Sequence, residues 1–204
     1  MSSCKRTKCK NASIKHKRMI YALICAVAAL MIAFCAITAK NILDRRTYRL
    51  LYPDEILACA DEFSLDPCLV AAVIQTESSN RAQVISPKGA VGLMQIMPAT
   101  GEWIAAKLNV SDYSEEKLKE PLFNIRLGCW YIRYLLDKYG GNERTALYAY
   151  NAGPGNVDKW LKDPQYAGTN GLENIPYTET ADYAVRVQSA KEKYSKLYEK
   201  ELCS

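Results

Sequence analysis

Hydrophobic residues along this chain follow two distinct patterns. Residues 19–39, MIYALICAVAALMIAFCAITA, form one uncharged run, and 21 apolar residues are enough to cross a bilayer as a helix. From Pro53 onwards, apolar residues instead recur three and four positions apart, most regularly at Leu122, Ile125, Cys129, Ile132, Leu136 and Tyr139. This period is typical of amphipathic helices. The pattern therefore predicts one membrane-crossing helix followed by a domain of packed helices.

Capping residues and glycines divide the second part into helices. Asp66 suits an N-cap and Pro67 a first helical position, while Gly140 and Gly141 suit a helix end. We expect helices at 53–63, 66–78, 98–108, 121–139, 142–152, 156–161 and 176–201, a short turn from Ser114, and a loop at 168–175. We find no convincing strand pattern and no repeat. The sequence therefore predicts an all-α domain.

The charges around the apolar run predict its orientation. Seven basic residues and no acidic residue precede it: Lys5, Arg6, Lys8, Lys10, Lys15, Lys17 and Arg18. This bias places the N-terminus in the cytoplasm and everything after Lys40 outside. A cleaved signal peptide is the alternative, although the run is long for one and Ile37–Ala39 is only a passable cleavage site.

We therefore expect a single-pass protein of the cell membrane with four parts. These are a basic cytoplasmic tail at 1–18, an uncleaved anchor at 19–39, a linker at 40–52 and an extracytoplasmic helical domain at 53–204. All 22 acidic residues lie beyond residue 39, beside 20 of the 27 basic ones. The outer part therefore has no basic footprint for nucleic acid, while the tail favours anionic lipid.

The cysteines and the scarcity of histidine restrict the chemistry. Cys59, Cys68, Cys129 and Cys203 would lie outside, where disulfides can form. Four cysteines allow three pairings, and four buried thiols are the alternative. The only histidine is His16 in the tail, and there is no Cys-x-x-Cys motif, so we expect no metal site and no histidine-activated nucleophile.

Glu77 is the first candidate catalytic residue. It continues the apolar stripe of its helix, four positions after Val73. Burial disfavours the charged form of a carboxyl group and raises its pKa, and the negative end of the helix dipole acts in the same direction. A carboxyl group that stays protonated near neutral pH suits a general acid. The alternative is a structural glutamate that reaches solvent or pairs with Arg81.

A glycine-rich segment follows Glu77 at residues 86–98, SPKGAVGLMQIMP. Gly89 and Gly92 let a backbone approach a ligand closely. The segment is too apolar for an ordinary solvated turn and too rich in glycine for a strand interior. We expect it to fold back towards Glu77.

Three later segments complete a recognisable set. Asn124–Gly128 with Tyr131, Ala149–Gly153, and Ile175–Glu179 with Tyr183 follow in order. Together with Glu77 and residues 86–95, they make the chain resemble the catalytic domain of the soluble-lytic-transglycosylase family, which has the goose-type lysozyme fold. Two positions depart from the family pattern. Asn80 replaces an aromatic residue, and a common proline is missing near Ala82.

The resemblance implies a lysozyme-like helical domain that acts on peptidoglycan glycan strands and needs no cofactor. Glu77 would protonate the oxygen between N-acetylmuramic acid and N-acetylglucosamine. It would then act as a base on the muramic acid 6-hydroxyl, giving a 1,6-anhydro product with assistance from the substrate's acetamido group. A muramidase on the same fold and a non-catalytic wall-binding scaffold are the alternatives. A cell-envelope assembly partner would be of unknown identity.

The resemblance also implies several supporting residues. Ser86 and Gln95 would hydrogen-bond Glu77 or the acetamido group, and Met94 and Met97 would form an apolar wall that keeps the acid protonated.

Three further substrate-binding residues come from the last two segments. Tyr150 would face the reacting sugar, beside Asn151, and Glu179 would be a supporting acid at the cleft. Asn124 and Gly128 are interpreted as scaffold, with the Asn124 amide holding the neighbouring loop.

Overall fold

The computed structural model describes residues 3–169 and 171–202, which fall into two units that divide between Thr47 and Tyr48. The first unit is one helix, α1 (Ser3–Thr47). Its segment Leu23–Thr47 is long and apolar enough to cross a membrane, by length and composition, and a signal sequence would meet the same criterion. The side chains of residues 1–18 and 20–22, which include the predicted basic tail, lie outside the described part. Anchoring through residues 19–39 therefore stays a prediction.

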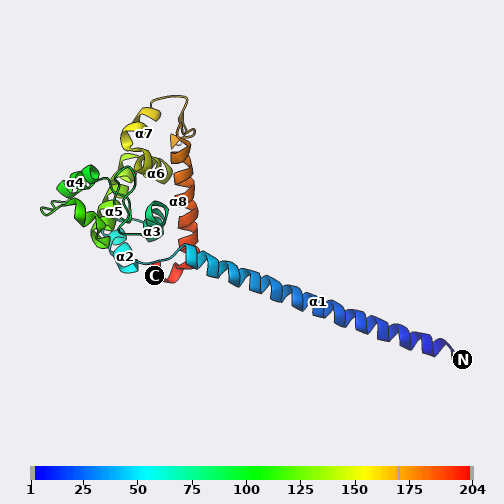
Figure 1. Ribbon diagram of the computed structural model, residues 1–204. Coiled ribbons are helices and arrows are strands. Elements are labelled where there is room, and N and C mark those ends of the chain that lie inside the picture. Colours follow the sequence, from blue (N-terminus) through cyan, green and yellow to red (C-terminus); the bar gives the residue numbers. More distant parts are fainter. Residues whose placement is uncertain (1–2, 170, 203–204) are drawn as a thin grey trace. The chain divides into compact units, whose positions relative to one another are not determined.

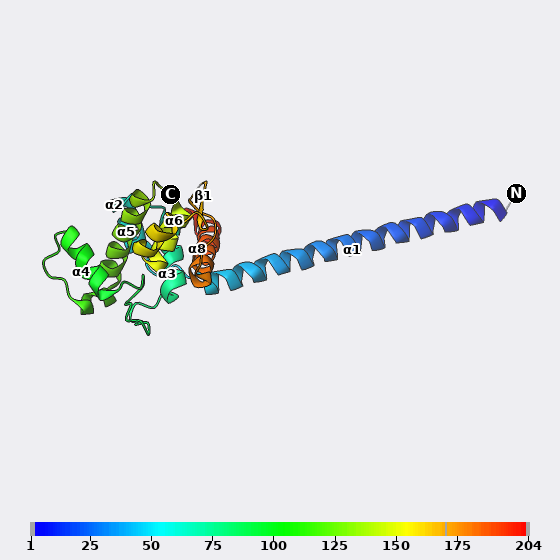
Figure 2. The ribbon, with the colours of Figure 1, turned by 90° about the horizontal axis from the view of Figure 1, so that it is seen from above.

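The second unit is almost entirely helical (Figures 1 and 2). Its elements are α2 (Pro53–Glu62), α3 (Pro67–Ser78), α4 (Pro98–Lys107), the 3-10 helix η1 (Glu115–Lys119), α5 (Pro121–Lys138), α6 (Glu143–Ala152), α7 (Pro154–Trp160), α8 (Thr178–Leu197) and α9 (Glu199–Leu202). The antiparallel strands β1 (Ala167–Gly168) and β2 (Gly171–Leu172) form its hairpin.

Local sequence signals such as capping residues predicted most of these elements correctly. The Asp66 side chain accepts a hydrogen bond from the Cys68 amide at 2.8 Å, and the Asn142 side chain accepts one from the Thr145 amide at 2.9 Å. These are the N-cap contacts expected of α3 and α6. The caps set where each helix begins, and they confirm the interpretation of both residues.

Three details differ from the prediction. The helix predicted at 156–161 begins at Pro154, because Gly153 turns the chain at φ 82° and proline then fits the first helical position. The long final helix breaks at Tyr198, whose φ of −133° is not helical. The loop predicted at 168–175 contains part of the β-hairpin, where Gly171 takes a φ of 114° that L side chains rarely adopt.

The expected linker at 40–52 is also divided by the structure. Residues up to Thr47 continue α1, whereas the residues from Tyr48 onwards belong to the second unit. The hydroxyls of Tyr194 and Tyr198 on the C-terminal part of the chain donate to the carbonyls of Arg49 and Tyr48 at 3.0 and 2.9 Å. The segment just before α2 is therefore attached to the helical domain.

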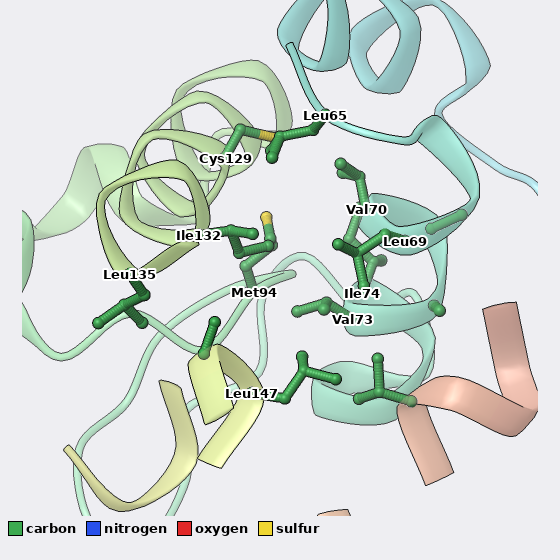
Figure 3. Close-up of a cluster of buried hydrophobic side chains, with 14 of the residues drawn as sticks. Leu65, Leu69, Val70, Val73, Ile74, Met94, Cys129, Ile132, Leu135 and Leu147 are labelled. Carbon is green, nitrogen blue, oxygen red and sulfur yellow. The ribbon is translucent and has the colours of Figure 1, made fainter. Parts of the chain in front are cut away.

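The core is built around α3. Val70, Val73 and Ile74 are completely buried, and both views place this helix between α5 and α8 (Figures 1 and 2). Met94 lies at the centre of the cluster in Figure 3, with α5 on one side and α3 on the other. This packing brings the C-terminal end of α3, which carries Glu77, beside the glycine-rich segment.

Candidate active site

A buried side chain from α5, that of Asn124, helps to hold the glycine-rich segment in place. The Asn124 carbonyl oxygen accepts a hydrogen bond from the Met94 amide at 2.7 Å. Its amide nitrogen donates to the carbonyls of Val91 and Leu118 at 3.0 and 2.7 Å. These bonds satisfy backbone groups that the fold removes from water. The predicted scaffold role of Asn124 is thereby confirmed.

Two glycines allow this close approach. A Cβ on Gly92 would overlap Asn124 and the Leu118 carbonyl, and a Cβ on Gly128 would overlap the Met94 side chain. Gly92 also has a φ of 81°, which favours glycine. Close helix–loop packing is therefore the reason for the glycine in the middle of α5, as its sequence position predicted.

Glu77 occupies the end of α3 at the edge of the core, and its side chain is largely sheltered. Burial raises the pKa of its carboxyl group to about 7, opposed more weakly by Tyr183 and by the positive charge of Arg186. The predicted direction of the shift is confirmed. Among the described residues Glu77 forms no ion pair, and Arg81 donates instead to the Ser78 carbonyl at 2.8 Å.

Tyr183 and Arg186 are contributions of α8 that we did not predict as neighbours of the acid. The Tyr183 hydroxyl is buried and interacts with the Glu77 carboxyl group. No described group lies in the right geometry to form a full hydrogen bond with this hydroxyl. It is therefore available to stabilise the ionised carboxylate. The motif containing Tyr183 was visible in the sequence, but its proximity to Glu77 depends on how α8 packs along α3.

Glu77 opens into a cavity of about 570 Å³. The described residues that line it are Glu77, Ser86, Pro87, Lys88, Ala90, Gln95, Met97, Tyr150, Asn151, Ala152, Tyr177, Glu179 and Thr180. They come from the end of α3, the glycine-rich segment, the end of α6 and the start of α8. The structure thus brings segments far apart in the sequence around one sheltered acid.

Ser86 and Gln95 line the cavity but are engaged with their own loop. The Ser86 hydroxyl accepts a hydrogen bond from the Ala90 amide at 3.0 Å. The Gln95 side chain donates to the carbonyls of Gly92 and Val84 at 2.8 and 3.3 Å, and its backbone has a φ of 50°. A non-glycine residue in this left-handed region is uncommon. Both side chains therefore shape the loop that faces Glu77.

The two methionines of the expected apolar wall differ. Met97 lines the cavity and is 42% exposed. Met94 does not line it; its side chain is fully buried against Gly128 in the core. The difference arises because Met94 points inward towards α5. Its contribution to the site is its carbonyl, which accepts a hydrogen bond from Tyr150.

The end of α6 supplies two of the expected residues. The Tyr150 hydroxyl donates to the Met94 carbonyl at 2.8 Å, and burial raises its pKa well above the usual value. Its ring is stacked with Tyr183 at a centroid distance of 6.5 Å. The Asn151 side-chain oxygen Oδ1 accepts a hydrogen bond from the Thr180 hydroxyl at 2.8 Å, which joins the end of α6 to the start of α8.

The exposed rim contains Glu179, Lys88 and Tyr177. The Tyr177 ring meets Trp160 edge-on at 5.1 Å, so an exposed aromatic face stands beside the cavity. Among the described residues no group of three or more His, Cys, Asp and Glu side chains could hold a metal ion. The arrangement provides one sheltered acid that can exchange a proton, with an exposed acid at the rim.

An all-α domain with one sheltered carboxyl group at the end of a core helix defines the class of lysozyme-like proteins. Residues 54–172, more than half of the chain, match the model of the Transglycosylase SLT domain family. The chain belongs to this family, so the predicted family and fold class are confirmed.

Relatives and solved structures agree with this membership. Over 119 residues the chain is 39% identical to the soluble lytic murein transglycosylase of Salmonella typhimurium, covering 57% of this chain but 18% of that protein. It is 26% identical over 179 residues to the membrane-bound lytic murein transglycosylase C of Edwardsiella ictaluri, covering 77% and 49%. The 70 kDa soluble lytic transglycosylase of Escherichia coli superposes with a TM-score of 0.69 and 31% identity, over 75% of this chain and 25% of that one.

Proposed function

We propose that this protein is a peptidoglycan lytic transglycosylase. It would cleave between N-acetylmuramic acid and N-acetylglucosamine and form a 1,6-anhydro end. The observation that carries this proposal is Glu77, a lone sheltered carboxyl group with a pKa of about 7 that opens into a cavity. The activity named for its relatives supports it.

In the first step, protonated Glu77 gives its proton to the glycosidic oxygen. The bond from that oxygen to the anomeric carbon breaks, and the N-acetylglucosamine side leaves with a hydroxyl group. The substrate's own acetamido oxygen attacks the anomeric carbon and meets the developing positive charge. A pKa near 7 suits this role, because a good share of the acid is protonated near neutral pH.

In the second step, ionised Glu77 removes the proton of the muramic acid 6-hydroxyl. The freed oxygen attacks the anomeric carbon and displaces the acetamido oxygen, which closes the 1,6-anhydro ring. Glu77 ends protonated, and no water is consumed. Tyr183 and Arg186, which lower the pKa of Glu77, favour the ionised form that this step requires.

The other cavity residues have supporting roles in the proposal. Ser86 and Gln95 fix the loop opposite Glu77, and Met97 excludes water from the acid. Tyr150 faces the reacting sugar, and Asn151 links its helix to α8.

Glu179, exposed at the rim, contacts a sugar or the peptide of the substrate. Glu179 lies in the first turn of α8, so its carboxylate is near the positive end of the helix dipole.

We also propose that the apolar run anchors the protein in the cell membrane, with the tail inside and the helical domain outside. The segment Leu23–Thr47, long and apolar enough to span, supports anchoring. The basic tail supports the orientation. In this arrangement the enzyme would act on wall close to the membrane.

Product analysis tests the activity. The full chain in detergent should release from purified sacculi fragments that are one water lighter than hydrolysis products. Glu77→Gln should reduce the rate by about 10² to 10⁴, the usual contribution of a general acid or base. Glu179→Gln, which changes an exposed acid at the same cavity, is the matched control and should retain much more activity.

Two results would overturn the proposal in different ways. Products that have gained a water would identify a muramidase. Equal loss of sacculus turbidity with native protein and Glu77→Gln would show that Glu77 does not catalyse the reaction.

A further inference from the structure

The contact between α2 and α5 has a defined register. Glu62 on α2 and Arg126 on α5 form a bidentate ion pair, with nitrogen–oxygen distances of 2.7 to 3.0 Å. Cys59 lies one helical turn before Glu62, and Cys129 lies one turn after Arg126. The Cys59 and Cys129 side chains also interact, so the two contacts lie one turn apart on each helix and run in opposite directions along them. The ion pair and the two cysteines therefore belong to one contact between α2 and α5.

Burial and contact agree with this register. Cys59 is 1% exposed and Cys129 is 0% exposed, and their side chains interact directly. Cys68 faces a different part of the domain, where it lines a cavity of about 330 Å³ with residues of α8. Cys203 lies outside the described residues. Of the three pairings that the sequence allowed, the described structure brings Cys59 and Cys129 together.

We propose that Cys59 and Cys129 form a disulfide bond when the domain meets a disulfide-bonded thiol oxidant, such as oxidised glutathione or an exported thiol oxidoreductase. One cysteine thiolate attacks the oxidant and releases its first thiol. The second thiolate then attacks the mixed disulfide and releases the second thiol. Two thiol protons leave with the two released thiols, and the oxidant is reduced as the cysteine pair is oxidised.

In the folded domain the two thiols influence each other's ionisation. The interaction with Cys129, with help from Arg126, lowers the pKa of Cys59, whereas burial raises the pKa of Cys129. The thiolate is the nucleophile in this exchange. Either thiolate can begin the exchange, because the exchange takes place when the pair is exposed and the folded surroundings of the two thiols no longer act.

Burial also determines when the bond can form. Neither sulfur is accessible to an oxidant in the folded domain, so oxidation occurs during folding or when α2 opens. We therefore expect rapid oxidation of the refolding chain and slow oxidation of the folded, reduced protein.

The bond would stabilise the part of α5 that supports the candidate active site. Cys129 follows Gly128, against which Met94 packs, and the Met94 carbonyl holds the Tyr150 hydroxyl. A link from Cys59 to Cys129 closes a loop of about 70 residues. Closing a long loop stabilises a fold mainly by restricting the unfolded chain.

Peptide mapping tests the pairing directly. The full chain is unfolded, reduced, and refolded in detergent with reduced and oxidised glutathione, then blocked with iodoacetamide and digested with trypsin and a glutamate-specific protease. Cleavage after Glu55 and Glu62 separates Cys59 from Cys68, and cleavage after Arg126 and Arg133 isolates Cys129. We expect peptide 56–62 joined to peptide 127–133, lighter than the two thiols by two hydrogen atoms and separated by reduction.

Matched variants control the experiment. Cys68→Ala should retain the linked peptide, whereas Cys129→Ala should lose it. Dithiothreitol should lower the melting temperature of the oxidised native chain by about 10 °C, estimated for a loop of this length in a domain of this size. The doubly substituted Cys59→Ala, Cys129→Ala chain should show no such drop, while Cys68→Ala should show it.

The outcomes are decisive for the pairing and separate from the proposed enzymatic activity. Recovery of Cys59 and Cys129 as alkylated thiols after refolding in oxidant would overturn the proposal. A link from either one to Cys68 or Cys203 would also overturn it. None of these results changes the identity of the glycan products, so failure of the disulfide and failure of the transglycosylase proposal are distinguishable.

Discussion

At the scale of single residues, Glu77 shows how a fold can give an ordinary side chain an unusual protonation state. The helix pattern directs it towards the core, and burial raises the pKa of its carboxyl group to about 7. Tyr183 and Arg186 from α8 oppose that shift. In the proposed mechanism the same group supplies a proton in one step and accepts one in the next, and both influences on its pKa suit that role.

Replacing Tyr183 should move the pH dependence of the reaction. Its hydroxyl lowers the pKa of Glu77, so Tyr183→Phe should raise that pKa. In the proposed mechanism the rate falls as Glu77 loses its proton, so we expect a fall in kcat/KM near pH 7 that shifts to higher pH in the variant. Tyr150→Phe, whose hydroxyl bonds to the Met94 carbonyl, is the control and should leave the position of the fall unchanged. An unshifted profile for Tyr183→Phe would show that the Tyr183 hydroxyl does not lower the pKa of Glu77.

The raised pKa of Glu77 should also be visible in stability. A carboxyl group with a folded pKa of about 7 and an unfolded value near 4.5 binds more protons in the folded state between these values. Its contribution is therefore fully present below about pH 4.5 and is lost as pH rises through 7. Relative to native protein, Glu77→Gln should gain up to about 3 kcal/mol in unfolding free energy between pH 5 and pH 8.

Urea unfolding at the two pH values measures this difference. Glu179→Gln, at an exposed position, should run parallel to the native protein. Parallel behaviour of Glu77→Gln as well would mean that the Glu77 carboxyl group has an ordinary pKa.

At the scale of elements, α5 is the support on which the site is assembled. Asn124 binds the glycine-rich segment through two hydrogen bonds and η1 through a third. One turn later Gly128 leaves room for the Met94 side chain. The helix tolerates a mid-helix glycine, at a cost of about 1 kcal/mol relative to alanine, because the loop needs that space.

Gly128→Ala should therefore destabilise the domain despite the better helix propensity of alanine. The new methyl group would overlap Met94, and overpacking of a core typically costs about 1 to 3 kcal/mol. Gly155→Ala on α7 is a matched control, because a methyl group there meets open space. Denaturant unfolding should show a loss for the first variant and little change for the second. Equal stability in both would show that the contact with Met94 yields easily.

At the scale of the whole molecule, the chain consists of the helix α1 and a helical domain that begins at Tyr48. The segment Leu23–Thr47 of α1 is long and apolar enough to cross a membrane. The domain includes its own N-terminal segment, because Tyr194 and Tyr198 hold the carbonyls of Arg49 and Tyr48. A cut just before Tyr48 should therefore preserve the domain, whereas a cut just before Pro53 should remove part of its packing.

Cell fractionation tests the proposed anchor. The full chain should sediment with membranes and resist extraction by high salt, because an apolar span of this length inserts stably. A protease added outside the membrane should digest the domain and leave the N-terminal tail intact. The full chain in the soluble fraction, or a mature protein that begins after Ala39, would instead indicate a cleaved leader.

The sequence by itself determined the features that depend on local chemistry. The helix boundaries follow from caps such as Asp66 and Asn142 and from apolar spacing, because these contacts join residues only a few positions apart. The direction of the Glu77 pKa shift followed from its place on an apolar stripe. The reason for Gly128 could likewise be inferred, since a glycine within a helix implies close packing.

Only the tertiary structure decided which distant groups meet. Met94 and Met97 are three residues apart in one loop, yet one is buried against α5 and the other lines the cavity. Tyr183 reaches Glu77 from α8, and Cys59 meets Cys129 across the α2–α5 contact. Such contacts depend on the register and packing of whole helices, and these are set by the shared core rather than by neighbouring residues in the chain.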